Sequence, residues 1–511
     1  MSGDVGEGPG GGPGEEPGER WEGRRVVVTG LGVSGTAAAV ALAERGARVV
    51  AVEARDGEAE RDRAGLLEVL GGRALLGAGA AAALPAVDGE APELVVTSPG
   101  WRPDAPALVQ AQAAGVPVWG EVELAWRLRG PGAAPWLTVT GTNGKTTTVR
   151  MLAAILAAAG LRTTAAGNIG TPLVEAVLDP RGHDVLAVEL SSFQLHWTRT
   201  VSPRASACLN VAPDHLDWHG SLQAYAADKG RVYERTEVAC VYSAEDPLTE
   251  RLVREADVVE GCRAVGTTLG VPDVSMLGVV DEVLCDRAFV QERRTSAAEL
   301  ATLEDLREAA GGVLAPHTVH DALSAAALAR AHGVPPVAVR DGLRATGPGE
   351  HRIAVVARAG GVTWVDDSKA TNPHAAAASL AGAERAVWVA GGLAKGAAYD
   401  DLVARHAQRL RAVVLIGADR APLREALARR APGVPVVEVA VEGGAEGRAG
   451  SGAAVMAEAV RAAAAAARPG DTVLLAPASA SMDQFASYAE RGDAFAAAVR
   501  AHLGGARDGG A

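Results

Sequence analysis

Cysteine is scarce in this 511-residue chain, and its placement excludes two common architectures. Cys208, Cys240, Cys262 and Cys285 lie far apart and form no C-x-x-C pair. Cysteine-based zinc sites and disulfide frameworks both need cysteines at closer or more regular spacings. We therefore expect neither, and we expect the chain to work in a reducing cytoplasm.

Long apolar runs and an excess of positive charge are also missing. No stretch reaches the roughly 18 apolar residues of a membrane span. The first residues are Gly, Pro and Glu rather than a basic segment followed by an apolar one. The formal net charge is -13 and the pI is near 5.4. Because nucleic acid and anionic membranes would not be attracted to such a surface, we expect a soluble, unexported protein that has neither as its main partner.

The order of strands and helices predicts an α/β fold with three domains. Hydrophobic residues make up 48% of the chain, which is ample for buried cores. Residues 1–22 have little to bury and should form a disordered tail. From residue 23 onwards, short β-branched strands alternate with Ala-rich helices, as parallel sheets with crossover helices require. Gly- and Pro-rich breaks at 128–135 and 344–352 predict domains at 23–130, 131–347 and 348–511.

The expected strands share runs of Val, Leu, Ile and Thr. They are 24–30, 47–53 and 93–100 in the first domain, 136–141, 184–190, 204–211 and 237–243 in the second, and 362–368, 385–392, 411–417, 434–440 and 471–478 in the third. An Ala-rich helix is expected over 321–332, near the end of the second domain.

The loop "GTNGKT" at Gly141–Thr146 is the strongest single motif. Its backbone N–H groups can hold phosphate oxygens, Lys145 can reach the outer phosphates, and Thr146 can offer a hydroxyl to Mg²⁺. Val139 stands where the full phosphate-loop pattern has its first glycine. A plain glycine turn is the alternative, but a lysine followed by three threonines at a helix start has no use in packing.

A second glycine motif, G-x-G-x-x-G, begins at Gly30 in the first predicted strand–helix turn. Such turns bind dinucleotides, but they also serve simply to bring a helix close to a strand. Glu53 and Arg55 end the next strand, where they could bond a ribose or a base edge, or lie at a solvated strand end. We expect some phosphate-bearing ligand here.

Further polar residues follow strands of the second and third domains, and ligands bind at that edge of a parallel sheet. Glu189, at the end of its strand, is well placed for Mg²⁺, with a loop cap as the alternative. In the third domain each polar residue taken singly is more often solvent-facing, and the clustering of the polar loops favours a shared ligand face. They are Glu189, Asp214, His215, Asp217 and His219 in the second domain, and Asp366, Asp367, Ser368, Lys369, Thr371, Asn372, Lys395, Ser481 and Arg491 in the third.

Together these stretches resemble the Mur ligase family. The resemblance rests on "TGTNGKTTT", "GNIGTP", "VELSSFQL", "NVAPDHLDWHGS", "YAADKGRVY", "EHR", "DDSKATN", "GGLAKG" and "ASASMDQF", in that order. It implies cytoplasmic peptidoglycan synthesis, in which ATP drives the joining of D-glutamate to UDP-N-acetylmuramoyl-L-alanine through an acyl phosphate. It also implies that the first domain binds the UDP moiety rather than NAD, and that the enzyme is a monomer using two Mg²⁺ ions.

The resemblance assigns a role to each motif residue. It implies that ATP contacts Gly141, Thr142, Asn143, Gly144, Lys145, Thr146, Thr147, Thr318, Asp321, Arg352 and Asp367; that the UDP substrate contacts Val33, Ser34, Glu53, Arg55, Gly100, Asn168 and His215; and that D-glutamate contacts Thr371, Lys395, Ser481 and Tyr488. The implied metal ligands are Thr146, Glu189, His215 and Lys229, and the implied catalytic residues are Lys145, His215, Lys229, Arg352 and Lys369.

The chain departs from the family pattern at three positions. Glu53 stands where the family has Asp, which lengthens that side chain. Thr318 and Asp321 replace the two asparagines of the family's H-N-x-x-N, so weaker ATP binding is expected; Asp can accept from the adenine amino group, but Thr318 cannot copy both faces of an amide.

Without the resemblance, the sequence predicts that Lys229 is an ordinary solvated lysine on a helix. The resemblance instead implies a lysine that CO₂ converts to a carbamate, an anionic ligand for Mg²⁺.

Other functions remain open from the residues alone. They are a ligase of the same superfamily acting on another amino acid or on folate, an NAD-dependent oxidoreductase fused to an NTPase, and a non-catalytic nucleotide-binding regulator. The UDP pocket and "DDSKATN" argue against the first.

Overall fold

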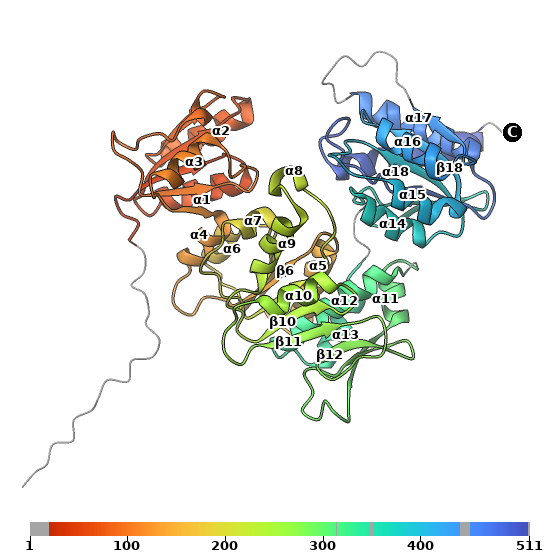
Figure 1. Cartoon of the computed structure of the whole chain (residues 1–511), viewed down its shortest axis with the longest axis horizontal. Coiled ribbons are helices and arrows are strands. Elements are labelled where there is room, and N and C mark those ends of the chain that lie inside the picture. Colours follow the sequence, from red (N-terminus) through yellow and green to blue (C-terminus); the bar gives the residue numbers. More distant parts are fainter. Residues whose placement is uncertain (1–19, 313, 348–350, 440–449, 509–511) are drawn as a thin grey trace, which may run out of the picture. The chain divides into compact units, whose positions relative to one another are not determined.

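The computed structural model describes residues 20–312, 314–347, 351–439 and 450–508. Three β-sheets follow one another along the chain (Figure 1), most of their strands are parallel, and helices connect them, so the predicted α/β class is confirmed. Residues 20–134, 170–182 and 193–201 form one compact unit, and the other described residues form a second unit that contains two sheets. The predicted tail lies outside the described residues up to position 19, and so do positions 348–350 at the second predicted domain boundary.

Unit 1 is built on a five-stranded parallel sheet of order β3-β2-β1-β4-β5. Its strands are β1 (Arg25–Thr29), β2 (Arg48–Glu53), β3 (Arg73–Leu76), β4 (Leu94–Thr97) and β5 (Val118–Gly120). Its helices are α1 (Val33–Ala43), α2 (Glu58–Val69), the 3₁₀ turn η1 (Ala80–Ala82), α3 (Pro106–Ala113), α4 (Glu121–Leu128), α6 (Leu173–Leu178) and most of α7 (Ser192–His196). Trp21, inside the predicted tail, is buried in this unit and its ring meets Trp119 edge-on.

Two buried carboxylates on α4 attach later chain segments to unit 1. Glu121 accepts a hydrogen bond from the backbone N–H of Val174 at 2.9 Å. Glu123 accepts from the backbone N–H groups of Arg199 and Thr200 and from the Thr200 hydroxyl. Buried polar groups persist where they are hydrogen-bonded in this way, so α4 fixes stretches that the sequence had assigned to the second domain.

The first sheet of unit 2 has nine strands in the order β14-β13-β12-β11-β10-β9-β6-β8-β7. The strands from β7 to β12 in that row are parallel, and β13 and β14 add an antiparallel edge. They are β6 (Trp136–Thr140), β7 (Thr163–Gly167), β8 (Val185–Glu189), β9 (Ala205–Cys208), β10 (Ala239–Ser243), β11 (Arg263–Thr267), β12 (Met276–Val280), β13 (Val283–Asp286) and β14 (Ala298–Thr302).

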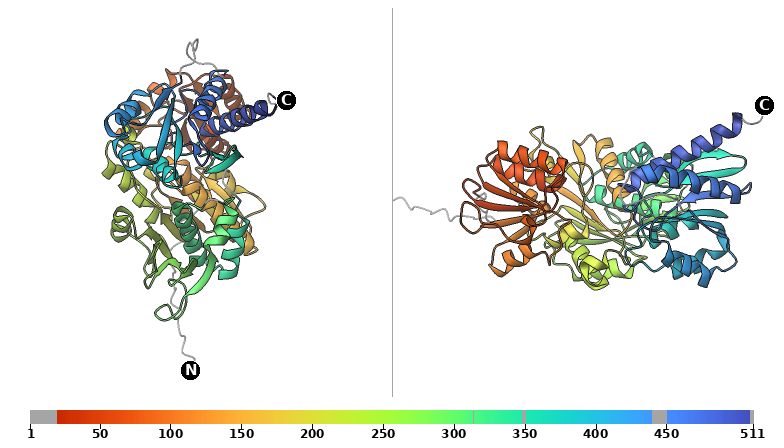
Figure 2. Two further views of the ribbon diagram at one scale, coloured as in Figure 1. Left: turned by 90° about the vertical axis from the view of Figure 1, so that its right-hand side faces the viewer. Right: turned by 90° about the horizontal axis from the view of Figure 1, so that it is seen from above.

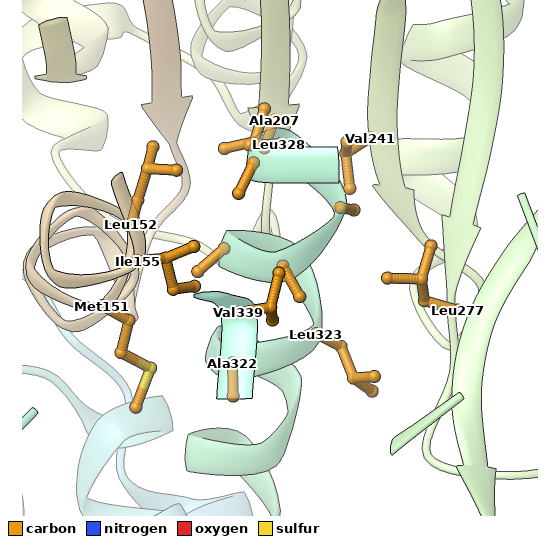
Figure 3. Packing of buried hydrophobic residues seen from close by; sticks show 14 of the residues in the cluster. Met151, Leu152, Ile155, Ala207, Val241, Leu277, Ala322, Leu323, Leu328 and Val339 are labelled. Carbon is orange, nitrogen blue, oxygen red and sulfur yellow. The ribbon is translucent and has the colours of Figure 1, made fainter. Parts of the chain in front are cut away.

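The helices that accompany this sheet are α5 (Lys145–Ala158), α8 (Leu216–His219), α9 (Leu222–Gly230), the 3₁₀ turn η2 (Arg231–Tyr233), α10 (Pro247–Glu255), α11 (Leu303–Ala309), α12 (Pro316–Ala331) and α13 (Pro336–Ala345). The core forms where α5 and α12 meet the sheet. Leu152 and Ile155 of α5 face Ala322 and Leu328 of α12, and the same cluster includes Val241 of β10 (Figure 3). Burial of this apolar surface fixes α12 and the phosphate loop, which begins α5, on one framework.

The second sheet of unit 2 has the order β15-β16-β20-β17-β18-β19, with only β15 antiparallel to its neighbour among the described strands. The strands are β15 (Ala354–Ala359), β16 (Val362–Asp366), β17 (Ala386–Gly391), β18 (Leu410–Ile416), β19 (Val436–Glu438) and β20 (Thr472–Leu475). The helices are α14 (Pro373–Ala381), α15 (Asp400–His406), the 3₁₀ turn η3 (Ala407–Arg409), α16 (Ala421–Arg430), α17 (Gly450–Ala466) and α18 (Tyr488–Asp508).

Helices cover both faces of this second sheet (Figure 2). Trp388 packs with α14, α15 and α16, whereas its neighbours Val387 and Val389 pack with α17 and α18. Alternate strand residues point to opposite faces, so the continuous apolar run of β17 reflects burial on both sides.

Every strand expected from the sequence is present, generally with fewer residues than the sequence run suggested. Strands β3, β5, β7 and β11–β15 were not predicted. None of the helices in the described ranges has the length and apolar character that a membrane crossing needs.

The contact between α13 and α5 generates a stability prediction. A Cβ on Gly342 would lie 2.3 Å from Cα of Ile155, which is backbone and cannot rotate away. We expect Gly342→Ala to destabilise the protein by about 1–3 kcal/mol because the helices must separate. Gly65→Ala is a matched control, since Gly65 is also helical and a Cβ there meets nothing within 4 Å. That variant should gain roughly 0.5–1 kcal/mol. Urea unfolding of both variants checks this, and equal stabilities would contradict it.

Candidate active site

A cavity of about 780 Å³ in unit 2 collects most of the predicted site residues. The phosphate loop, the segment after β9, the start of α12 and the loop after β16 all contribute to its lining. Each of these segments lies at the carboxyl end of a strand or the amino end of a helix, the edge where α/β sheets bind ligands. Many of the polar residues predicted to share a ligand face therefore line one cavity.

The phosphate loop joins β6 to α5 in a conformation that needs glycine. Gly141 has φ +154° and Gly144 has φ +88°, backbone geometry that side chains disfavour. Nζ of Lys145 donates to the carbonyl oxygens of Gly141 and Thr142, at 2.8 and 3.0 Å. The Lys145 side chain therefore folds back onto its own loop. Its amine lies within reach of a phosphate held by the backbone N–H groups at the start of α5.

Lys229 is buried beside the same loop, so the alternative of a solvated lysine is wrong. It is 1% exposed, and its Nζ donates to the Gly141 carbonyl at 2.8 Å. The ring of Tyr225, one turn earlier on α9, lies 4.6 Å from this ammonium group. Burial, reinforced by the charge of Lys145, lowers the pKa of Lys229 to about 7.

The predicted metal ligands show one feature that suits a cation. Glu189, at the end of β8, is 1% exposed and accepts from Asn168 Nδ2 at 2.8 Å through Oε1. Its other oxygen, Oε2, is buried without a hydrogen-bond partner among the described residues. An orphaned buried carboxylate oxygen is costly unless a cation or water joins it, and Mg²⁺ prefers oxygen ligands.

The other predicted ligands are less clustered. Thr146 and His215 line the cavity with Glu189. Within the described part of the chain, no group of three or more His, Cys, Asp or Glu side chains is arranged to hold a metal ion by itself. Mg²⁺ commonly keeps several waters and substrate phosphates as ligands, so a sparse protein set fits it. Burial lowers the pKa of His215, which favours the neutral imidazole.

The loop after β16 and the first turn of α14 contact the phosphate loop through three side chains. Nζ of Lys369 donates to the Thr146 hydroxyl at 2.9 Å. Nδ2 of Asn372 donates to Oδ1 of Asn143 at 3.1 Å, and His374 Nδ1 lies 3.0 Å from Asn143 Nδ2. Burial and the charge of Arg352 lower the pKa of Lys369 to about 7. Asn372 also caps α14, as its position before Pro373 predicted.

Arg491 is buried, not solvent-facing as expected, and it holds this loop by hydrogen bonds. It is 1% exposed and donates to the Ser368 hydroxyl, the Ser368 carbonyl and the Ser479 carbonyl. Asp367, next to Ser368, accepts from the Ser379 hydroxyl and lines the cavity. Burial raises the pKa of Asp367 to about 6.

The start of α12 forms the remaining wall of the cavity. Thr318 and Asp321 both line it, together with Arg352. Asp321 is 4% exposed, and its Oδ2 has no hydrogen-bond partner within the described residues. His320, between them, lies 2.9 Å from Oε2 of Glu245 and 3.0 Å from the Ser243 hydroxyl.

The predicted D-glutamate residues are only partly brought together. Thr371 and Tyr488 line the cavity, and Nζ of Lys369 lies 5.1 Å from the ring of Tyr488. Ser481 is buried and Lys395 is exposed, and neither lines the cavity. Gly141 and Lys229 are likewise absent from the lining.

Five of the predicted UDP-binding residues belong to unit 1. Val33, Ser34, Glu53, Arg55 and Gly100 are in this unit, whereas Asn168 and His215 line the cavity of unit 2. Glu53 is not at a solvated strand end: it is buried and accepts from the Leu31 N–H at 2.9 Å and from the Arg55 N–H at 3.1 Å. Although burial opposes this, these hydrogen bonds lower its pKa.

In the glycine turn after β1, one glycine permits a close backbone contact and another leaves space for a ligand. A Cβ on Gly35 would lie 1.8 Å from the Gly30 carbonyl, whereas a Cβ on Gly32 would meet nothing within 4 Å. Gly35 therefore allows helix α1 to approach the strand, and the backbone at Gly32 is open to a ligand. Both roles considered for this motif are compatible with the geometry.

Sequence reasoning missed several residues that shape the cavity. Asn210 Oδ1 accepts from the Asn143 N–H and its Nδ2 donates to the Asn143 carbonyl, which clamps the phosphate loop. Tyr225 places its hydroxyl 3.1 Å from that of Thr142. His374 and Glu245 were missed as well. Asn210 lies at the end of the predicted strand 204–211 and opens the motif "NVAPDHLDWHGS", and that position could have identified it.

Comparisons with known proteins agree with this geometry. Residues 139–268 match the Mur ligase middle domain, and residues 351–479 match the Mur ligase glutamate ligase domain. Proteins named UDP-N-acetylmuramoylalanine--D-glutamate ligase match from Streptomyces avermitilis (61% identity, 94% of this chain, 98% of the relative) and Thermobifida fusca (56%, 94% and 99%). The chain therefore belongs to the UDP-N-acetylmuramoylalanine--D-glutamate ligase family of Mur ligases.

Solved structures resemble the chain in fold. The UDP-N-acetylmuramate-alanine ligase MurC of Thermotoga maritima has a TM-score of 0.51 at 18% identity, covering 94% of this chain and 99% of that one. The MurF ligase of the same organism, solved in complex with ADP, has a TM-score of 0.52 at 15% identity, covering 89% and 95%. At these identities the likeness shows the multi-domain α/β architecture alone.

The lysine of the phosphate loop generates a binding prediction. We expect Lys145→Ala to raise the Kd for ADP about 10- to 100-fold, because a charge-assisted hydrogen bond contributes roughly 1.5–3 kcal/mol. Isothermal titration measures this, with thermal unfolding as a check on the fold. Lys395→Ala is the matched control, since Lys395 is exposed and outside the cavity lining. Equal ADP affinities for the two variants would overturn the role given to Lys145.

Proposed function

We propose that this chain is an ATP-dependent ligase that joins D-glutamate to UDP-N-acetylmuramoyl-L-alanine, as a monomer in the cytoplasm, during peptidoglycan synthesis. The observation that carries the proposal is the convergence of Lys145, Lys369 and Arg352 on one cavity that also holds the orphaned carboxylate of Glu189. Such a cavity suits the neutralisation of several converging anions. The names of the near full-length relatives supply the substrate class.

The reaction has two steps whose charges the site can balance. An oxygen of the L-alanyl carboxylate attacks the γ-phosphorus of ATP, the bond to the β-phosphate oxygen breaks, and an acyl phosphate and ADP result. The amine of D-glutamate, after losing a proton, then attacks the acyl carbon and expels inorganic phosphate. Lys145, Lys369 and Arg352 offset the charge on the transferring phosphoryl group, and the phosphate-loop backbone holds the remaining phosphates.

We propose that Mg²⁺ binds beside the phosphate loop, through Thr146, Glu189, His215 and a carbamate on Lys229, with two ions present in the full complex. An ion held by these residues would supply positive charge that offsets the charge of the ATP phosphates. The unpartnered Oε2 of Glu189 supports this assignment.

The setting of Lys229 supports the carbamate. CO₂ reacts with a neutral amine, and the lowered pKa of about 7 provides one near neutral pH. Two ammonium groups, those of Lys145 and Lys229, donate to the same Gly141 carbonyl. Conversion of one of them to an anion would remove the repulsion between them.

We further propose that the open turn at Gly32 in unit 1, with Val33, Ser34, Glu53, Arg55 and Gly100, receives the uridine diphosphate. Asn168 and His215 would contact the substrate from unit 2. D-Glutamate would be held by Thr371, Tyr488, Lys395 and Ser481. The hydrogen bonds that fix Glu53 to the turn indicate that Glu53 shapes this pocket as well as contacting the ligand.

A coupled assay for phosphate release tests the reaction. We expect release only when ATP, UDP-N-acetylmuramoyl-L-alanine and D-glutamate are all present, and background rates with L-glutamate. Isothermal titration with NADH should show no binding, which separates the ligase from a dehydrogenase. Phosphate release without the muramoyl substrate, or equal rates with the two enantiomers, would refute the proposal.

Lys229 can be tested by isotope labelling, because lysine occurs at only four positions, 145, 229, 369 and 395. We expect incubation with ¹³C-bicarbonate and Mg²⁺ to give a carbamate ¹³C resonance that disappears in Lys229→Ala and persists in Lys395→Ala.

Activity provides a second readout for the same variant. Lys229→Ala should lose most of its activity, and acetate should restore part of it by occupying the vacated space near the metal. Full activity without an added carboxylate, or a resonance that survives the substitution, would show that no carbamate on Lys229 is required.

A further inference from the structure

Two of the four cysteines touch each other on neighbouring strands of the first sheet of unit 2. Cys240 is the second residue of β10, and Cys262 immediately precedes β11, which runs parallel to β10 at its side (Figure 1). Their Sγ atoms lie 3.8 Å apart, within hydrogen-bond range for sulfur. The fold therefore brings together two thiols that are 22 positions apart in the chain.

Backbone hydrogen bonds hold the turn that carries Cys262 beside the start of β10. The Val259 N–H donates to the Thr236 carbonyl at 3.1 Å, and the Arg263 N–H donates to the Val238 carbonyl at 3.1 Å. Within this turn Gly261 is exposed, and a Cβ there would meet nothing within 4 Å. The turn is thus tied at both ends, and its middle has room for a small shift.

The two thiols differ in exposure and in acidity. Cys240 is 1% exposed, and its sulfur accepts a hydrogen bond from the Ser206 hydroxyl at 3.7 Å, whereas Cys262 is only partly buried. The hydrogen bond from Cys240 lowers the pKa of Cys262, and the backbone N–H groups of Arg263 and Cys240 act in the same direction against the effect of burial. The same thiol–thiol bond and burial raise the pKa of Cys240. An accessible thiol that ionises readily is therefore backed by a protonated one, as in reactive dithiols.

A zinc site is the other common use of paired cysteines, and the surroundings do not suit it. Zinc takes four ligands from Cys, His and carboxylate side chains. The polar neighbours of Cys240 are hydroxyl groups, those of Ser206 and Thr236, which lie 2.7 Å from each other. In the described ranges no group of three or more His, Cys, Asp or Glu side chains is placed to hold a metal ion. The pair therefore suits oxidation rather than metal binding.

We propose that Cys240 and Cys262 form a reversible redox site that reacts with hydroperoxides and closes to a disulfide. The Cys262 thiolate attacks one oxygen of hydrogen peroxide, the O–O bond breaks, and the released hydroxide takes up a proton to give water. The sulfenic acid left on Cys262 then reacts with the Cys240 thiol: the S–S bond forms, the S–O bond breaks, and a second water leaves with the Cys240 proton. The two thiols lose two electrons, which the peroxide accepts. A small thiol reverses the step by two exchange reactions and is itself oxidised to a disulfide.

The bond would close the segment 240–262, which contains β10 and α10, at the end away from the cavity. Cys240 lies in a strand that pairs with β9 on one side and β11 on the other, so the turn before β11 makes the adjustment. The cavity residues of this segment, Ser243, Glu245 and Asp246, lie at the other end of β10 or beyond it. We therefore expect the disulfide to stabilise the fold by constraining the unfolded chain, and to leave nucleotide binding unchanged.

Peptide mapping of the full chain tests the bond itself. The protein is treated with hydrogen peroxide, unfolded in an alkylating reagent and digested with trypsin, which places Cys240 in peptide 236–251 and Cys262 in peptide 255–263. We expect these two peptides to be joined, and dithiothreitol to separate them. Cys262→Ala should lose the joined pair and leave Cys240 open to alkylation. Cys285→Ala is the matched control, because Cys285 lies on β13 outside the segment, and it should keep the pair.

Two results of the wild-type map would overturn the proposal, whether or not the variants fold. One is Cys262 alkylated or oxidised to a sulfinic acid while Cys240 remains alkylated. The other is a disulfide that uses Cys208 or Cys285 instead. The map needs neither nucleotide nor substrate, so its outcome is separate from that of the ligase assay.

Urea unfolding and ADP titration test the expected consequences. Without reductant, oxidised wild type should unfold at a higher urea concentration than reduced wild type, and peroxide should not shift the midpoint of Cys262→Ala. The Kd for ADP should change by less than about twofold on oxidation of wild type. An unchanged midpoint in protein that carries the bond, or a Kd that rises by about tenfold, would refute closure at the turn.

Discussion

The site depends on one constraint: lysine amines lie close together around the phosphate loop, and two of them share the carbonyl oxygen of Gly141. Lys145 and Lys229 both donate to Gly141, and Lys369 is tied to Thr146 two residues into α5. Three buried or half-buried ammonium groups around one loop repel one another, and burial adds to the cost of each charge. The arrangement is tolerable when anions enter the cavity or when an amine gives up its proton. A site built in this way is complete only with its phosphates.

Composition reflects the same constraint. The chain has 49 lysines and arginines, but lysine appears only at 145, 229, 369 and 395, each in a motif of the predicted site. Arginine remains charged in almost any setting, whereas lysine readily changes its pKa when buried. The arginines provide ion pairs across the structure, as in Arg330 with Asp286 and Arg411 with Asp471. Three of the four lysines, Lys145, Lys229 and Lys369, lie at the phosphate loop, where burial lowers their pKa values.

Local patterns predicted the parts of the structure that have local causes. The strand–loop–helix context at Gly141 gave the phosphate loop, and the polar residues after strands gave most of the cavity lining, because the sheet edge collects them. The hairpin of β12 and β13 was missed because its turn, Asp281-Glu282, uses positive φ without the usual glycine or asparagine. The burial of Lys229, the clamp from Asn210 and the anchoring of later segments by Glu121 depend on contacts far apart in sequence. A short stretch of sequence therefore cannot predict these contacts.

The segments that carry Lys229 and Glu189 are joined by hydrogen bonds of His219, a residue that the sequence had placed on the predicted ligand face. His219, at the end of α8, lies 2.9 Å from Asp228 Oδ2 through Nδ1 and 3.0 Å from the Ser192 hydroxyl through Nε2. Ser192 follows Glu189 by three residues, and Asp228 precedes Lys229. These hydrogen bonds are buried, so they are shielded from water and hold α9 against the end of β8. The two groups proposed to share a cation are thus fixed by the framework before any ligand binds, which lowers the cost of assembling the site.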